Sequence, residues 1–191
     1  MKIIAITTPQ AMTEDVCLIQ SLIEKGVDVV HLRKPDASID ACRKILDALT
    51  LEQRSKIIIH DFPELYYEYS LKGIHVNKNV TSLPADYNGF KTRSCHSFEE
   101  LVMCKNEYDY LFLSPIFDSI SKNGYKSIYS GEELQDASNR GIIDDKVIAL
   151  GGVTLDKIEY LRKLHFGGVA MIGGIYNRKV LEKLDHLHAF K

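Results

Sequence analysis

Residues 146–176, KVIALGGVTLDKIEYLRKLHFGGVAMIGGIY, contain the same unit twice: a short apolar run that ends in two glycines. The first run, KVIALGG (146–152), is followed by TLDKIEYLRKLHF (154–166), in which apolar residues recur at helical spacing. The second run is GVAMIGGIY (168–176). Both runs are apolar throughout instead of alternating, which predicts strands covered on both faces, as in a parallel sheet flanked by helices.

The same alternation of apolar runs and helical patterns extends through the rest of the chain. The sequence predicts strands at 2–7, 27–33, 56–61, 73–77, 90–95, 108–115, 146–152 and 168–176, and helices at 13–26, 38–49, 63–73, 97–106, 131–140, 154–166 and 179–190. Only the stretch between the fourth and fifth strands lacks a clear helical pattern. Eight such units favour a closed (β/α)8 TIM barrel over an open doubly wound sheet. We therefore predict one barrel domain over residues 1–191.

Composition and charge exclude several classes of protein. The chain is 45% hydrophobic and 26% charged, with a net charge of −2, so we expect no nucleic-acid partner and no membrane association. No apolar stretch approaches the roughly 18 residues of a membrane span. Four cysteines show no metal-binding spacing, which favours reduced thiols and a cytoplasmic protein. A homo-oligomer is compatible with the sequence but is not predicted by it.

In a TIM barrel the loops that follow the strands build the active site. The glycine pairs at 151–152 and 173–174 lie toward the ends of the last two predicted strands, where barrels often bind phosphate through backbone N–H groups. Tight turns that need positive φ are the structural alternative for these glycines. The segment SPIFDSISK (114–122) adds hydroxyl donors at Ser119 and Ser121 and a positive charge at Lys122, which suits a phosphate or diphosphate.

Charged residues and histidines follow the earlier strands. Arg33 offers a planar fork for a second phosphate, and Asp61 is the carboxylate at this mouth that is suited to Mg²⁺. An ion pair between these two residues is the alternative. Four histidines lie on or just after different strands, without a metal-ligand spacing: His31, His60, His75 and His96. For each of them a hydrogen-bonded structural role is favoured over metal ligation.

Several of these segments together resemble a known family. The segments GVDVVHLRK, RSCHSFEEL, SPIFDSISKNG, VIALGGVTLDKIEYL and GGVAMIGGIY are similar to the thiamin phosphate synthase and thiazole tautomerase superfamily, in the same order and at the same spacing. The similarity runs from IAITTP to about Tyr176. It implies a TIM barrel that binds a thiazole phosphate in thiamin biosynthesis.

The synthases of this family join a thiazole phosphate to a hydroxymethylpyrimidine diphosphate and release diphosphate with the help of Mg²⁺. By position, the resemblance implies that Ser94 contacts the pyrimidine diphosphate and that Asp61 binds Mg²⁺. It implies that Arg33 and Lys122 stabilise the departing diphosphate. The remaining matched positions would hold the diphosphate and the thiazole phosphate: Ser119, Ser121, Gly152, Ile172 and Gly173.

The chain departs from the family pattern on the pyrimidine diphosphate side of the site. His31 and His60 replace a glutamine and an asparagine, and Pro35 stands where the family has a lysine, with Lys34 one place earlier. The second Mg²⁺ aspartate falls near Asn79 and Val80. Loss of a carboxylate weakens metal binding, and loss of a lysine weakens charge neutralisation.

These departures leave three activities open within the family. We favour the synthase, a transferase. A thiazole tautomerase, with His31 or His60 as the base, is the enzymatic alternative, because members of that branch bind thiazole phosphates without Mg²⁺. However, Pro115 stands where that branch has its catalytic histidine. A thiazole-phosphate-binding regulator that has lost catalysis is the third alternative.

Overall fold

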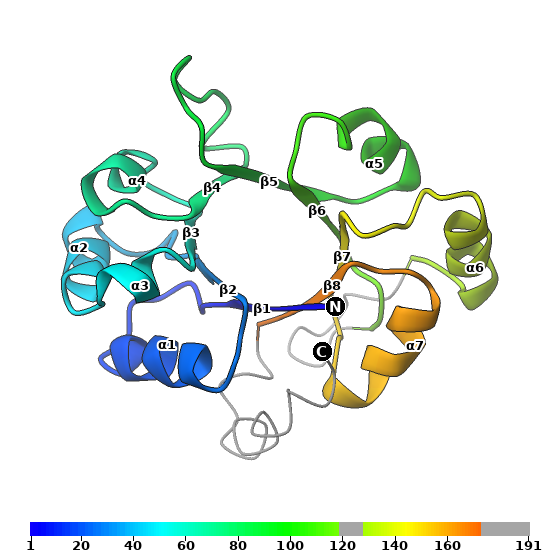
Figure 1. The fold of residues 1–191 in the computed structure, drawn as a ribbon, viewed down its shortest axis with the longest axis horizontal. Coiled ribbons are helices and arrows are strands. Elements are labelled where there is room, and N and C mark those ends of the chain that lie inside the picture. The colour runs from blue at the N-terminus through cyan, green and yellow to red at the C-terminus, as the bar shows by residue number, and fades with distance from the viewer. Residues whose placement is uncertain (119–127, 173–191) are drawn as a thin grey trace.

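The computed structural model describes residues 1–118 and 128–172. Eight parallel strands form a closed barrel in sequence order, and β1 pairs with β8 to complete the ring (Figure 1). The strands are β1 (Lys2–Ile6), β2 (Val29–Leu32), β3 (Ile57–Ile59), β4 (Gly73–Val76), β5 (Phe90–Cys95), β6 (Tyr110–Leu113), β7 (Val147–Leu150) and β8 (Gly168–Met171). The predicted (β/α)8 architecture is confirmed.

Helices surround the barrel on the outside (Figure 1). They are α1 (Asp15–Glu24), α2 (Ile39–Asp47), α3 (Leu51–Arg54), α4 (Glu64–Tyr69), α5 (Phe98–Cys104), α6 (Gly131–Asn139) and α7 (Ile158–Lys163), with a 3-10 turn η1 (Leu155–Lys157) before α7. As predicted, the chain between β4 and β5 forms no helix. The predicted last helix, 179–190, lies outside the described residues.

One predicted helix begins where expected and is followed by a second one. Ser38 caps α2 by accepting a hydrogen bond from the backbone N–H of Ala41. The chain then starts the short helix α3, where the Thr50 hydroxyl and the Gln53 side chain form a reciprocal capping box. The T-L-E-Q pattern at 50–53 is the sequence signal for this capping box.

Two apolar clusters divide the core. The larger cluster lies between the strands and the helices, where alternate strand residues such as Ile3 and Ala5 meet helix residues such as Leu22. The smaller cluster fills the barrel interior with residues of opposite parity, among them Ile4, Ile6 and Phe112. Most strands are therefore buried on both faces, which is why they read as continuous apolar runs. β5 is an exception, because Phe90 and Arg93 are exposed. The polar side chains described below are set within the smaller cluster.

Of the helices in the described part of the chain, none combines the length and the apolarity that crossing a bilayer requires.

Candidate active site

A cavity of about 510 Å³ opens at the C-terminal ends of the strands. Its volume lies within the usual range for sites that bind small molecules. The charged and polar residues that line it include Arg33, Asp36, His60, Asp61, Lys78 and Ser94. A second hollow, of about 750 Å³, lies at the other end of the barrel, beside Met1, Asp144 and Phe166. Barrel enzymes place their chemistry at the C-terminal end, so the smaller cavity is the candidate site.

The structure describes seven of the eleven predicted site residues and brings five of them to this cavity. Arg33, His60, Asp61, Ser94 and Ile172 all line it. His31 and Gly152 do not belong to its lining. The other predicted residues lie outside the described part of the chain: Ser119, Ser121, Lys122 and Gly173.

Arg33 and Asp61 are held by backbone hydrogen bonds of the first loops. The Thr7 hydroxyl accepts a hydrogen bond from the Arg33 backbone N–H (2.9 Å), and Asp61 Oδ2 accepts one from the Lys34 N–H (3.3 Å). The ion pairs formed within residues 1–118 and 128–172 do not include Arg33 with Asp61. The guanidinium and the carboxylate are therefore available to a ligand.

Lys34 does not take the place of the missing family lysine at the mouth. Its ammonium group is fully buried and lies 2.7 Å from Asp15 Oδ2, and it also donates to the carbonyl of Gln10 (2.7 Å). Asp15 in turn accepts a hydrogen bond from the Met12 N–H (2.7 Å). Lys34 therefore joins the loop after β2 to the loop after β1, and it contributes no charge to the cavity.

Two charged residues that were not predicted from the sequence also line the cavity. Lys78, from the loop after β4, adds an exposed ammonium group, and Asp36, from the loop after β2, adds a second carboxylate to the lining that contains Asp61. The family pattern places the missing lysine at Pro35 and the missing aspartate near Val80, which is 4% exposed. A signal was available, because both Lys78 and Asp36 lie in loops that follow predicted strands.

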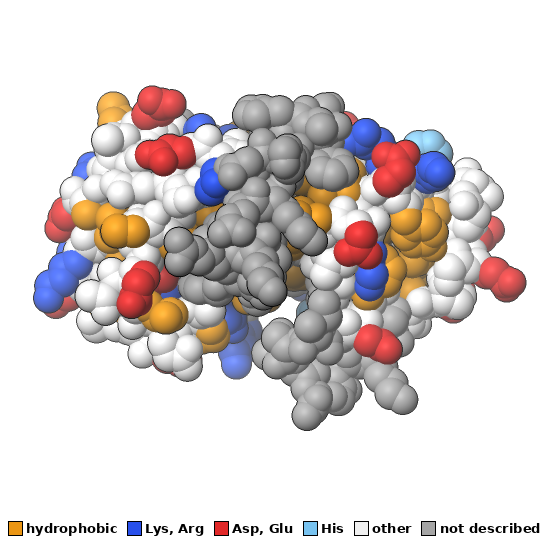
Figure 2. All heavy atoms as spheres, turned by 90° about the horizontal axis from the view of Figure 1, so that it is seen from below, with side chains coloured by type: hydrophobic (Ala, Val, Ile, Leu, Met, Phe, Trp, Pro, Cys, Tyr) orange, Lys and Arg blue, Asp and Glu red, His pale blue; other side chains and the backbone are white. Residues whose placement is uncertain are grey.

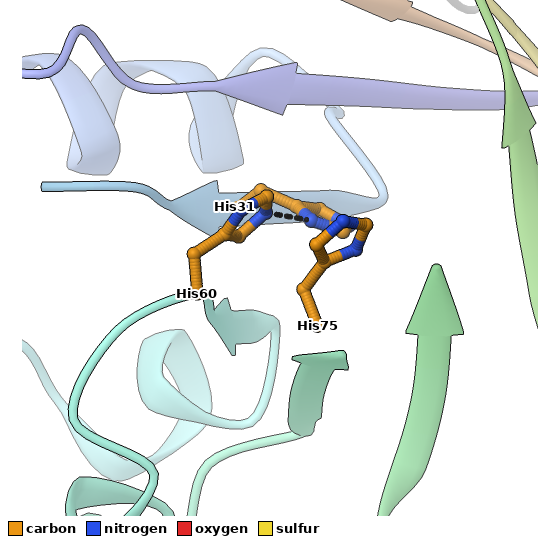
Figure 3. Close-up of side chains that lie close together, drawn as sticks. All are labelled: His31, His60 and His75. Carbon is orange, nitrogen blue, oxygen red and sulfur yellow. Dashed lines mark hydrogen bonds between the residues drawn. The ribbon is translucent and has the colours of Figure 1, made fainter. Parts of the chain in front are cut away.

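Three histidines meet inside the barrel (Figure 3). His31 Nδ1 lies 2.7 Å from His60 Nε2, and the rings of His60 and His75 stack at 4.0 Å between centroids. His75 Nδ1 is hydrogen-bonded to the Thr92 hydroxyl at 2.8 Å. As predicted, these three histidines are hydrogen-bonded, and the catalytic roles considered for His31 and His60 stay predictions. Spacing along the chain gave no sign that they meet.

The histidine cluster is arranged as a hydrogen-bonded group. One ring nitrogen from each imidazole lies within 4.8 Å of the others, so a metal ion is chemically conceivable there. However, two ligands on a tetrahedral zinc ion lie roughly 3.3 Å apart, given Zn–N bonds of about 2.0–2.1 Å. His31 and His60 are closer than that, at a distance that requires a shared hydrogen. The rings would have to separate to admit an ion.

Burial keeps all three imidazoles neutral. It lowers the pKa of His31 and of His60 well below 6.5, and the neighbouring imidazoles lower both further. Burial also lowers the pKa of His75 to about 3, with a smaller contribution from the charge of Arg33. A neutral imidazole has one donor and one acceptor nitrogen, so each ring can both give and accept a hydrogen bond.

We expect the fold to lose stability in mild acid. Each histidine has a lower pKa folded than unfolded, so the unfolded chain binds more protons between the two values. This contribution is intact above pH 6.5 and falls by about 1.4 kcal/mol per pH unit for each histidine below it, for His75 down to about pH 3. Urea unfolding at pH 7.5, 6.5 and 5.5 measures this. A free energy of unfolding that is unchanged across that range would contradict the neutral cluster.

The first glycine pair has a structural reason as well as a candidate binding role. Gly151 and Gly152 have φ values of 94° and 60°. A Cβ atom on Gly152 would lie 2.3 Å from the carbonyl oxygen of Asp118, and one on Gly151 would lie 2.8 Å from Cα of Pro115. The turn therefore requires glycine because the chain at 115–118 packs directly on it. Phosphate binding at Gly152 stays a prediction.

One face of the molecule shows both signs of charge among its described residues (Figure 2). From the side that carries α1 and α7, acidic and basic side chains of the described residues are interspersed (Figure 2). The described residues of that face offer no extended field of one sign. Four charged side chains line the cavity: Arg33, Asp36, Asp61 and Lys78.

Comparison with known proteins decides the family. Residues 3–175 match the model of the thiamine monophosphate synthase family. The chain belongs to this family. A thiamine-phosphate synthase from Clostridioides difficile is 28% identical over 177 residues, which cover 87% of this chain and 82% of the relative.

Solved structures agree with this assignment. A thiamine phosphate pyrophosphorylase from Bacteroides thetaiotaomicron has a TM-score of 0.89 and 35% identity, covering 100% of this chain and 97% of that one. A thiamine phosphate pyrophosphorylase from Pyrococcus furiosus has a TM-score of 0.78 and covers 99% of this chain and 94% of its own. Its sequence identity is 19%, so it supports the fold alone. Membership of the family makes thiamin biosynthesis the pathway of this chain and a transferase its enzyme class.

Proposed function

We propose that this protein is a thiamin-phosphate synthase that transfers a hydroxymethylpyrimidine group from its diphosphate to a thiazole phosphate and releases diphosphate. The observation that carries the proposal is the cavity at the strand ends, which gathers two cations, Arg33 and Lys78, with two carboxylates, Asp36 and Asp61. Cations match the oxygens of a diphosphate, and carboxylates match a metal ion that such a group brings with it.

The donor set of the cavity fits Mg²⁺. Mg²⁺ binds through one or two carboxylates together with substrate oxygens and water, and Asp61 and Asp36 line the same cavity. These two residues would hold the ion, with Asp36 in place of the aspartate that the family has near Val80. When bound, Mg²⁺ neutralises charge on the leaving diphosphate.

The residues of the chain act on the leaving group and on the geometry of the two substrates. As the bond between the pyrimidine methylene carbon and the diphosphate oxygen breaks, the thiazole nitrogen forms the new bond to that carbon. Arg33 and Lys78 stabilise the negative charge that develops on the diphosphate. His60 and Ser94 line the wall where the ring would lie, together with apolar side chains such as Phe112. This wall orients the ring and keeps water away from the electron-poor methylene carbon.

The phosphate of the thiazole substrate is expected at the ends of the last strands. Ile172 lines the cavity beside Leu150, at the ends of β8 and β7. This is the recurring phosphate position of TIM barrels. The contributions predicted for Gly173, Ser119, Ser121 and Lys122 fall on residues outside the described part of the chain and stay predictions.

The proposal is tested by incubating the protein with both substrates, with and without Mg²⁺, and measuring thiamin phosphate by mass spectrometry. We expect product only when both substrates and Mg²⁺ are present. Binding of thiazole phosphate without any product under either condition would overturn the synthase and favour the regulator. Isomerisation of a thiazole carboxylate phosphate, independent of Mg²⁺, would favour the tautomerase.

Lys78 gives a specific prediction about diphosphate binding. Lys78→Ala should weaken the binding of inorganic diphosphate in the presence of Mg²⁺ by about tenfold or more, because a hydrogen bond to a charged group contributes roughly 1.5–3 kcal/mol. Calorimetry measures the affinity. Lys44→Ala, an exposed lysine of α2, is the matched control and should bind as the wild type does. Equal affinity for Lys78→Ala and the wild type would remove Lys78 from the site.

A further inference from the structure

A line of hydrogen bonds runs through the barrel interior from Tyr110 to the cavity. The Tyr110 hydroxyl oxygen lies 2.5 Å from His31 Nε2, and His31 Nδ1 lies 2.7 Å from His60 Nε2. Tyr110 is the first residue of β6, His31 lies in β2, and His60 follows the last residue of β3. The line therefore begins at the start of one strand and reaches the mouth, where His60 lines the cavity.

The buried end of this line sets the direction of every hydrogen bond in it. Tyr110 is 1% exposed, and His31 is the only hydrogen-bond partner of its hydroxyl among the described residues. A buried O–H that donates to no acceptor is unfavourable, so the hydroxyl donates to His31 Nε2. Burial raises the pKa of Tyr110 well above 10, so this proton stays on the oxygen.

The remaining directions follow from that first hydrogen bond and from the contact between the two imidazoles. Because His31 Nε2 accepts, its hydrogen is on Nδ1, and Nδ1–H donates to His60 Nε2. Because His60 Nε2 accepts, its hydrogen is on Nδ1. His60 Nδ1 has no hydrogen-bond partner among residues 1–118 and 128–172, and in Figure 3 it lies away from the contact with His31.

We infer that Tyr110 is a positioning residue that fixes the tautomers of His31 and His60, so that His60 presents an Nδ1–H hydrogen-bond donor to the cavity. The ligand of this wall is then an uncharged ring with an acceptor nitrogen or oxygen. This part of the inference rests on the proposed function, in which a pyrimidine supplies that acceptor. A neutral His60 with its hydrogen on Nδ1 cannot take a proton from a substrate at that atom, so it is a poor base for a tautomerase.

The ring of His60 is also held in place from its other side. His75 stacks on it with an angle of 15° between the ring planes, and Thr92 and Ser94 contact the two nitrogens of His75 at 2.8 and 3.3 Å. These contacts fix the ring plane of His60, while Tyr110, acting through His31, fixes which ring nitrogen of His60 carries the hydrogen. The ring plane and the position of the hydrogen together set the direction in which the Nδ1–H donor of His60 points.

The tautomers are measured directly by nuclear magnetic resonance of the free protein labelled with ¹⁵N-histidine at pH 7.5. We expect His31 and His60 each to carry the hydrogen on Nδ1, with assignments made from His31→Asn and His60→Asn. In Tyr110→Phe, His31 Nε2 no longer accepts a hydrogen bond from the tyrosine hydroxyl. The ¹⁵N chemical shifts of His31 and His60 should then move toward the values of a mixture of tautomers. A wild-type His60 with its hydrogen on Nε2 would overturn the inference. This spectrum requires no substrate and no folded variant of Tyr110, so it decides the tautomers even if the proposed function is wrong.

A binding experiment tests the consequence for the ligand. Tyr110→Phe should bind hydroxymethylpyrimidine diphosphate about threefold to tenfold more weakly than the wild type and inorganic diphosphate equally well, both with Mg²⁺ present. Tyr108→Phe removes a hydroxyl from the apolar cluster outside the barrel and should leave both affinities unchanged. Equal losses for both ligands, or unchanged affinity for the pyrimidine compound, would contradict the role of Tyr110 in ring recognition.

Discussion

Lys34→Ala should lower the free energy of unfolding by about 3–5 kcal/mol, the usual loss when one partner of a buried ion pair is removed. The ammonium group and the Asp15 carboxylate are both 0% exposed and lie 2.7 Å apart. Without Lys34, the Asp15 charge stays buried, and the carbonyl of Gln10 loses a donor at 2.7 Å. Urea unfolding monitored by circular dichroism measures the loss.

Two further variants show how much of the stability lost in Lys34→Ala comes from the ion pair and how much from the loss of side-chain volume. The double substitution Lys34→Met with Asp15→Leu removes both charges and should recover part of the stability, since a buried pair can be replaced by apolar residues of similar size. Arg140→Ala breaks a pair with Asp136 in which both side chains are about two-thirds exposed, and it should cost no more than about 1 kcal/mol. A Lys34→Ala protein as stable as Arg140→Ala would show that the buried pair is not formed.

Arg33→Ala should reduce kcat/KM for thiamin phosphate formation by about 10²–10³, the loss expected when a donor to a developing anionic charge is removed. Its backbone is fixed by Thr7, and its side chain lines the cavity without an ion pair in the described part of the chain. Arg33→Lys should retain part of the activity, because lysine keeps the charge but not the planar fork. Steady-state kinetics with both substrates measures the effect.

The control for this prediction is the stability of the variants. Arg33 is not part of the apolar clusters, so Arg33→Ala and Arg33→Lys should unfold at nearly the wild-type denaturant concentration. Arg140, the C-cap residue of α6, is not part of the cavity lining, so Arg140→Ala should keep full activity. If Arg33→Ala turned over at the wild-type rate, or if it lost activity only because it unfolded, Arg33 would not stabilise the leaving group.

The fold could be predicted because its signal is repeated along the chain. A strand buried on both faces reads as a continuous apolar run, and β1, β2, β3, β6, β7 and β8 all do so. β5 has the predicted bounds, and the other observed strands are shorter than the predicted ones, because predicted runs such as 146–152 include the glycine turn beyond Leu150. The short helix α3 was missed because it occupies four residues, too few to show a helical period.

The site could be predicted only in part, because it depends on contacts between strands. The sequence places Arg33 and Asp61 at strand ends, and the barrel brings both to one cavity. It cannot show that Lys34 turns inward to Asp15, since a lysine in a loop usually stays in water. The meeting of His31 with Tyr110 requires the closed barrel, because 79 residues separate them in the chain.

The measurement that tests the central claim most directly is the stoichiometry of diphosphate release against thiamin phosphate formation, in one reaction, as a function of Mg²⁺. The account predicts one diphosphate for each thiamin phosphate, negligible release of diphosphate when thiazole phosphate is omitted, and loss of both products when Mg²⁺ is removed. Diphosphate release at the same rate without thiazole phosphate would indicate hydrolysis at an unprotected methylene carbon. That result, or a complete absence of both products with all components present, would contradict the assignment of this barrel as a synthase.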